Sequence, residues 1–282
     1  MRWPPPPDWP MAAHSRLVEC RPHRWHVQEA GEGPLALLLH GAGGATQSWR
    51  GLFPLLAARR RVVAIDLPGQ GYSRCGAPDR LGLDEMAEDV AALAAGQGWS
   101  PDLVVGHSAG GALALRLATT PGFAGARIVG INAALEEWSG VAGWMMPRAA
   151  RALAAAPFAA TAISAAIATP ARVRRLVEGT GSRIDEAGLG FYLRLVRDPG
   201  HVAGTVGMMA RWSVSGVNAV LGRIAAPVLL IAGERDRAVP PRVAERTAAR
   251  LPHGRALRMP GLGHLMHEED PAAVLAAIEG WA

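Results

Sequence analysis

Short, mostly apolar runs recur along this chain and alternate with helical patterns. Apolar runs of about five residues are typical of strands that a sheet buries on both faces. The runs are Leu35–Leu39, Val62–Asp66, Leu103–Gly106, Arg127–Ile131, Val228–Ala232 and Ala256–Met259, and the helical patterns cover Leu83–Ala95, Ala109–Thr119, Pro241–Leu251 and Pro271–Trp281. This alternation predicts an α/β fold with a mostly parallel sheet and helices on both faces.

Two extended segments, Ser15–Cys20 and Arg24–Glu29, precede these runs, so we expect eight strands. The first residues, 1–14, predict an irregular arm. The stretch 133–226 is too long for a loop in a compact domain, and it contains amphipathic pieces such as Leu189–Val196. It therefore predicts a helical cap, inserted into a core formed by residues 1–132 and 227–282.

Aromatic and methionine side chains are frequent in the predicted cap. They form either a small core of the cap itself or one wall of an apolar substrate pocket between cap and sheet. The candidates for the pocket are Trp138, Trp144, Met145, Met208, Met209 and Trp212. Another cap segment, Ala152–Ala168, is uncharged, rich in alanine and interrupted by Pro157. It is short for a membrane span and predicts a helix of the cap, with peripheral membrane contact as the alternative.

Composition limits the classes of partner. The net charge is +5, but the 29 basic residues are all arginine and are scattered, so the sequence does not favour nucleic-acid binding. Cys20 and Cys75 have no metal-ligand spacing and imply no disulfide framework, which favours the reducing cytoplasm. The start of the chain lacks the apolar stretch of a signal peptide. No metal site and no cofactor is expected.

Gly106-His107-Ser108-Ala109-Gly110 lies where a predicted strand gives way to a predicted helix. The pattern Gly-x-Ser-x-Gly in this context is typical of a nucleophile elbow, in which a sharp turn exposes the serine. The two glycines leave room for the turn, and the start of the helix stabilises negative charge beside it. Ser108 is therefore the candidate nucleophile. The alternative is an ordinary glycine-rich turn.

A serine hydroxyl needs a base, and in this architecture the acid and then the histidine follow the serine along the chain. Asp236 follows the strand Val228–Ala232, and His264 follows the last predicted strand. Both are expected at the carboxyl edge of the sheet, beside Ser108. The alternatives are His267 for the base and Glu234, Glu136 or Glu137 for the acid. His107 is expected to point away from the site and to be structural.

An oxyanion hole requires two backbone N–H groups beside the nucleophile. We expect one from Ala109, directly after Ser108, and the other from Ala42, in the loop His40-Gly41-Ala42-Gly43-Gly44. The alternative is that these glycines only form a turn. The loop is no phosphate cradle, because it lacks the lysine of a P-loop and does not match the dinucleotide fingerprint.

The stretch 66–73, DLPGQGYS, resembles the DxPGxGxS turn of α/β-hydrolases, with Gln70 where histidine is usual. That turn is generally structural. Seven further stretches are distinctive: Asp8-Trp9-Pro10, RWHVQ (24–28), HGAGGATQSWR (40–50), GTGSRIDEAG (179–188), DPGHVAGTVGMMARW (198–212), GERDRAVPP (233–241) and PGLGHLMHEEDP (260–271). With these motifs, the chain as a whole resembles α/β-hydrolases with a cap, and within them the BchO-type magnesium chelatase accessory proteins of bacteriochlorophyll biosynthesis.

The resemblance implies a role near the insertion of Mg²⁺ into protoporphyrin IX, with ATP-driven metal insertion left to partner subunits. Together with the Ser-His-Asp pattern, it predicts a serine hydrolase that cleaves an ester or similar acyl bond of an apolar substrate. The alternatives are an accessory protein without catalysis, which binds a porphyrin or chelatase subunits, and a general carboxylesterase or perhydrolase.

Overall fold

A computed structural model describes residues 1–137, 152–153, 156 and 158–281. Its centre is an eight-stranded sheet in the order β1-β2-β4-β3-β5-β6-β7-β8. β2 is antiparallel to β1 and β4, and all other neighbours are parallel. The strands are β1 (Ser15–Cys20), β2 (His23–Ala30), β3 (Leu35–Leu39), β4 (Arg61–Ile65), β5 (Leu103–His107), β6 (Arg127–Ile131), β7 (Val228–Gly233) and β8 (Gly254–Met259). The predicted eight-stranded, mostly parallel sheet is confirmed.

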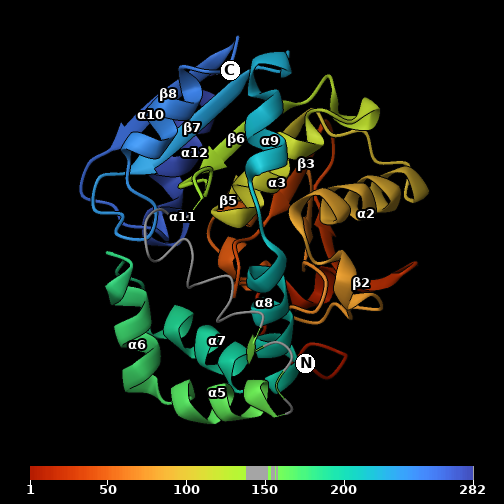
Figure 1. Cartoon of the computed structure of the whole chain (residues 1–282), viewed down its shortest axis with the longest axis vertical. Coiled ribbons are helices and arrows are strands. Elements are labelled where there is room, and N and C mark those ends of the chain that lie inside the picture. Colours follow the sequence, from red (N-terminus) through yellow and green to blue (C-terminus); the bar gives the residue numbers. More distant parts are fainter. Residues whose placement is uncertain (138–151, 154–155, 157, 282) are drawn as a thin grey trace.

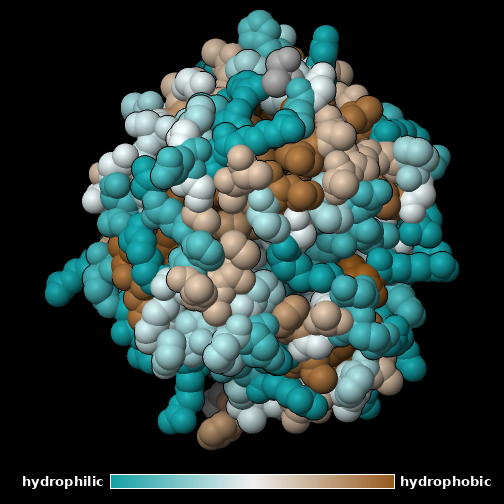
Figure 2. All heavy atoms as spheres, turned by 180° about the vertical axis from the view of Figure 1, so that it is seen from behind, coloured by the Kyte–Doolittle hydropathy of each residue, from teal (hydrophilic) through white to brown (hydrophobic). Residues whose placement is uncertain are grey.

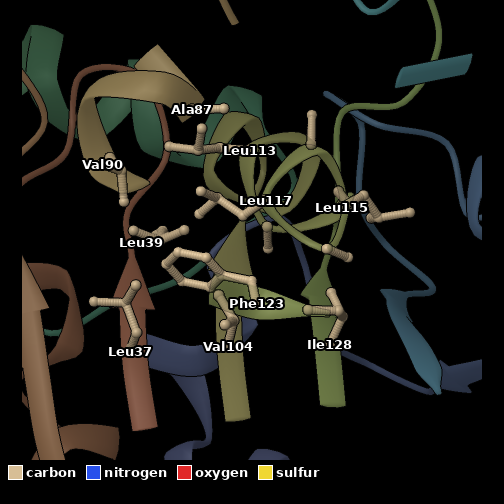
Figure 3. Packing of buried hydrophobic residues seen from close by; sticks show 14 of the residues in the cluster. Leu37, Leu39, Ala87, Val90, Val104, Leu113, Leu115, Leu117, Phe123 and Ile128 are labelled. Carbon is tan, nitrogen blue, oxygen red and sulfur yellow. The ribbon is translucent and has the colours of Figure 1, made fainter. Parts of the chain in front are cut away.

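Both faces of the sheet are covered by helices, which explains the continuous apolar runs of the central strands. Successive residues of β3 point to opposite faces: Leu37 and Leu39 belong to one buried cluster, and Ala36 and Leu38 to the other. The first cluster also takes side chains from α2 (Leu83–Gly96), α3 (Ala109–Leu117) and α10 (Arg242–Ala248), and the second from α1 (Leu52–Ala57), α11 (Met266–Glu269) and α12 (Pro271–Glu279). Figure 3 shows Leu39 and Phe123 packed below α2 and α3 in the first cluster.

The expectation that all six apolar runs are buried on both faces is wrong for the last strand. β8 is the edge strand, and its residues from Arg255 to Arg258 are exposed. It also begins two residues earlier than the predicted Ala256. The prediction failed because β8 lies at the edge of the sheet, with a neighbouring strand on one side only, and its run of mostly apolar residues did not reveal this position.

The described part of the stretch 133–226 is helical. It contains α5 (Ala159–Ile167), α6 (Pro170–Gly179), α7 (Glu186–Val196), α8 (Pro199–Arg211) and α9 (Ser215–Val220). In Figure 1, α5 to α8 lie together below the sheet, while α9 runs back beside α3. Val217 of α9 is fully buried in the main core. The end of this stretch therefore packs with the core. α8 packs against α5 and α7 and also contributes Met208 to the main core.

No helix in the described ranges is long and apolar enough to cross a membrane. Within the segment Ala152–Ala168, α5 is short, and the neighbouring Phe158 is 85% exposed. On the face in Figure 2, small apolar patches are interspersed with polar side chains. Peripheral membrane contact stays a prediction.

Candidate active site

The strand β5 turns into α3 at a strained residue, Ser108. Its backbone has φ 51° and ψ −115°, and φ is positive in only a few non-glycine residues. The glycines on either side make the turn sterically feasible. A Cβ on Gly106 would lie 2.0 Å from the carbonyl oxygen of Gly110, and one on Gly110 would lie 2.1 Å from that of Leu39. The predicted elbow geometry is therefore present, and Ser108 is half-buried at its apex.

The structure brings Asp236 and His264 together. The Nδ1 of His264 lies 2.7 Å from the Oδ2 of Asp236, and both side chains are nearly or fully buried. The other carboxylate oxygen of Asp236 accepts hydrogen bonds from the N–H groups of Ala238 and Val239. A carboxylate only accepts hydrogen bonds, so Nδ1 carries a proton, and in the neutral ring Nε2 is then the acceptor. This is the arrangement in which a histidine acts as a general base.

Three polar side chains hold the loop that carries His264. Its carbonyl oxygen accepts hydrogen bonds from His107 Nε2 at 2.9 Å and from Asn132 Nδ2 at 2.8 Å. The next N–H group, that of Leu265, donates to the Ser182 hydroxyl at 2.7 Å. Asn132 also accepts a hydrogen bond from the N–H of Gly233, at the end of the strand that leads to Asp236. The candidate base His264 and the candidate acid Asp236 are thus connected through a shared network at the strand ends.

The loop after β3 runs directly beside the elbow. A Cβ on Gly41 would lie 2.8 Å from His107 Nδ1 and 3.0 Å from the Cβ of Ser108. The N–H of Gly44 donates to the carbonyl of Gly41 and closes a turn around Ala42. The N–H groups of Ala42 and Ala109 donate no hydrogen bond to the part of the chain that the structure describes. The oxyanion hole formed by these two N–H groups stays a prediction.

The Ser108 hydroxyl makes no direct hydrogen bond with His264, or with any other residue within the described ranges. Such bonds are often long before the substrate binds and shorten in the reacting complex.

The sequence matches the model of the α/β-hydrolase fold family over residues 34–271. The chain belongs to this family. It is also 44% identical over 279 residues to the magnesium-chelatase 30 kDa subunit of Rhodobacter capsulatus, an alignment that covers 98% of this chain and 97% of that one. The predicted family resemblance is thereby confirmed.

Solved structures give the same fold. An α/β-hydrolase fold protein from Burkholderia ambifaria is 26% identical with a TM-score of 0.78, over 93% of this chain and 96% of that one. A thermophilic esterase from Thermogutta terrifontis is 22% identical with a TM-score of 0.70, over 95% of this chain and 97% of that one. The esterase shares the fold, and its identity is too low to carry a function across.

The other histidines near the site of this α/β-hydrolase, His267 and His107, have different surroundings from His264. His267 is fully buried, and neither of its ring nitrogens has a partner among the described residues. Burial, followed by the nearby His264 and Arg50, lowers the pKa of His267 to about 3. His267 therefore stays neutral at pH 7. Its ring nitrogens also form no hydrogen bond with Asp236. Burial likewise holds the pKa of His107 well below its usual value, in keeping with a structural role.

The alternative acids also lie elsewhere. Glu234 is exposed. Glu136 forms an ion pair with Arg246 at 3.1 Å, and Glu137 accepts hydrogen bonds from the Ser213 hydroxyl and a neighbouring N–H group. Asp236 is thus the candidate acid whose carboxylate contacts a histidine at the strand ends.

The predicted pocket residues have mixed positions. Met208 is buried in the main core, Met209 is 39% exposed, and Trp212 is half-buried against the main core. Trp138, Trp144 and Met145 lie outside the described residues. A shared apolar pocket formed by these six residues therefore stays a prediction. No cluster of three or more histidine, cysteine, aspartate or glutamate side chains able to hold a metal ion lies within the described ranges.

The sequence did not reveal the residues that hold the site together. Asn132 has a positive φ of 46° directly after β6, and asparagine tolerates this conformation better than most residues. Ser182, Gln70 and His201 contact the site loops from segments far away along the chain. Of these residues, only Gln70 was conspicuous in the sequence, because it stands where histidine is usual in the 66–73 turn.

Proposed function

We propose that this α/β-hydrolase is a serine hydrolase that cleaves an ester or similar acyl bond, in a role beside magnesium insertion into a porphyrin. The observation that carries the catalytic part is the 2.7 Å contact between His264 and Asp236 at the strand ends, next to the strained Ser108. A histidine oriented by a buried carboxylate beside a serine nucleophile is the arrangement that acyl transfer requires.

In the proposed reaction, Ser108 Oγ attacks the carbonyl carbon of the substrate while His264 Nε2 takes the hydroxyl proton. The carbonyl oxygen becomes an oxyanion, which the N–H groups of Ala42 and Ala109 bind. Asp236 stabilises the imidazolium that forms. His264 then returns the proton to the leaving alkoxide or thiolate, and Ser108 keeps the acyl group. A water molecule, activated by His264, releases the acid and restores the serine.

The setting of this reaction is supported by the relative from Rhodobacter capsulatus, whose name identifies it as a magnesium-chelatase subunit. The two chains match over nearly their whole lengths, cap included, and caps differ widely among hydrolases. We therefore propose that the substrate or partner belongs to porphyrin chemistry, with Mg²⁺ as the metal inserted by the chelatase rather than a cofactor of this chain.

The catalytic part is tested with a fluorophosphonate probe and short-chain aryl esters. The wild-type protein is expected to be labelled and to hydrolyse the ester, whereas Ser108→Ala abolishes both. Ser48→Ala is a matched control, because the Ser48 hydroxyl is buried in a turn and donates to the carbonyl of Ala45. A wild-type protein that neither reacts with the probe nor hydrolyses any ester contradicts the proposal.

A second candidate is an accessory protein that uses no hydrolysis. It is favoured by the same full-length similarity to a chelatase subunit, since that name describes assembly with other subunits. The test is Ser108→Ala added to a magnesium chelatase assay with protoporphyrin IX. Stimulation equal to that by the wild type supports the second candidate, and loss of stimulation supports hydrolysis. Quenching of tryptophan fluorescence by protoporphyrin IX measures binding directly.

A further inference from the structure

The peptide groups that follow Ala42 are fixed from two directions. The N–H of Gly43 donates to Gln70 Oε1 at 2.7 Å, and the carbonyl of Gly43 lies 3.2 Å from His201 Nε2. Gly43 itself has a φ of +78°, a conformation that glycine adopts without strain. Because Ala42 directly precedes Gly43, these two contacts orient the turn that presents the Ala42 N–H.

His201 lies on the cap helix α8, and its hydrogen bonds define one tautomer of its ring. Its Nδ1 accepts a hydrogen bond from the N–H of Gly71 at 3.0 Å, so the ring proton lies on Nε2 and is donated to Gly43. The ring is buried, and burial, followed by the nearby His40, lowers the pKa of His201 to about 4. His201 therefore stays neutral at pH 7 and links two core loops to α8.

Gln70 is held in turn by the same helix. It is fully buried, its Nε2 lies 3.2 Å from Met208 Sδ, and its Oε1 also lies 3.4 Å from the Thr205 hydroxyl. Met208 and Thr205 belong to α8. Both groups that hold Gly43 are thus positioned by one helix of the cap, although Gln70 belongs to the core.

From these contacts we infer that Gln70 and His201 are positioning residues, which hold the oxyanion loop (residues 40–44) in the conformation needed for catalysis. Because His201 lies on α8 and Gln70 contacts it, that conformation depends on the position of this cap helix. This inference rests on the proposed hydrolase function. A substrate that shifts α8 changes the orientation of the Ala42 N–H, and a displaced oxyanion donor weakens binding of the transition state more than binding of the substrate.

Two substitutions at His201 test whether this residue positions Gly43 or only fills space. In His201→Gln, the amide nitrogen takes the place of Nε2 and still donates to Gly43. In His201→Asn, the side chain replaces only Nδ1, so the contact with Gly71 remains and the contact with Gly43 is lost. We expect His201→Gln to keep kcat for an aryl ester within about threefold. His201→Asn should lower kcat by about 10- to 100-fold, with KM nearly unchanged, since removal of a whole donor costs about 10²–10³-fold.

Gln70→Met tests the other contact, because methionine fills a similar volume and cannot accept the Gly43 N–H in the same place. We expect a similar fall in kcat. Hydrogen–deuterium exchange of a peptide covering residues 41–44 should be faster in Gln70→Met and His201→Asn than in the wild type. Ala203→Ser, on the exposed face of α8, is the control and should change neither readout.

Equal kcat values for His201→Gln and His201→Asn, together with unchanged exchange at 41–44, overturn the inference. Failure of the proposed function gives a different result: the wild type and Ser108→Ala are then equally inactive. In that case the catalytic role of the two residues is rejected with it, and the exchange measurement still decides whether they hold the loop.

Discussion

Asn132 connects the ends of three strands through one side chain. It follows β6, donates to the carbonyls of Gly263 and His264, and accepts from the N–H of Gly233, the last residue of β7. In Asn132→Asp, the carboxylate keeps the contact with Gly233 and loses both donors to the His264 loop. We expect esterase activity to fall by about 100-fold, because small displacements of a catalytic group have effects of this size.

The matched control for this change is Asn218→Asp. The Asn218 amide also donates to a backbone carbonyl, that of Leu135, but it lies away from the His264 loop. Its activity should equal that of the wild type. Equal activity of Asn132→Asp and the wild type, measured by aryl ester hydrolysis at pH 7, would show that the loop does not depend on this amide.

The glycines of the elbow are needed because a side chain would meet the backbone there. In Gly110→Ala, the new methyl group would lie 2.1 Å from the backbone oxygen of Leu39, so backbone must move. Overpacking of this kind costs about 1–3 kcal/mol, and urea unfolding should show a loss of that size together with weaker fluorophosphonate labelling. Gly122→Ala is the control, since no atom lies within 4 Å of its Cβ. Similar losses in both variants would contradict the steric explanation.

At the scale of elements, α7 and α11 meet at a buried carboxyl group. The Glu268 side chain on α11 is fully buried, accepts a hydrogen bond from the Tyr192 hydroxyl at 2.7 Å and lies 3.5 Å from Arg50 Nε. Burial raises the pKa of Glu268 to about 7, against the opposing effects of Tyr192 and Arg50. The folded protein therefore holds this proton more tightly than the unfolded chain does.

This pKa predicts how stability changes with pH. Between about pH 4.5 and 7 the folded state binds more protons at Glu268 than the unfolded state, so this group makes the free energy of unfolding fall as pH rises. The contribution is roughly 3 kcal/mol over that range. In Glu268→Gln this contribution should disappear, so the free energy of unfolding of the variant minus that of the wild type should increase from pH 5 to pH 7 in urea unfolding. Glu279→Gln, at an exposed ion pair, should keep the wild-type curve. If the free energy of unfolding of Glu268→Gln depends on pH as that of the wild type does, this carboxyl group does not titrate as expected.

The sequence predicted long, regular elements better than short ones. The buried central strands follow from apolar runs, and α2 follows from its amphipathic pattern. α1 and α11 were missed because they have six and four residues, too few to show a helical period, and α1 contains Pro54. The three residues Ser108, Asp236 and His264 could be proposed because their order and their places after strands follow from the fold. His201 could not, since it meets Gly43 158 residues away in the sequence.

For the whole molecule, the N-terminal arm connects the core to the cap. The buried Trp9 ring packs edge-on against Tyr72 of the core, with ring centroids 5.2 Å apart, and against Phe191 of α7 at 5.7 Å. The amino group of Met1 forms an ion pair with Asp198 at 3.3 Å, just before α8. Figure 1 shows this end of the chain beside the cap helices. The arm thus contributes contacts to the same group of helices that contacts the loop at residues 40–44.

Trp9→Ala removes the centre of these contacts. Truncation of a buried tryptophan costs about 3–5 kcal/mol, and urea unfolding should show a loss of that order. Because Trp9 contacts α7, limited proteolysis should cut the cap faster in this variant than in the wild type. Trp3→Ala is the control: Trp3 is 37% exposed and lies edge-on 5.8 Å from His26 and 6.4 Å from Tyr72, so its loss of stability should be smaller. If Trp9→Ala and Trp3→Ala unfold alike and the cap is cut at the wild-type rate in both, the arm does not hold the cap, and the position of α8 must depend on the core loops alone.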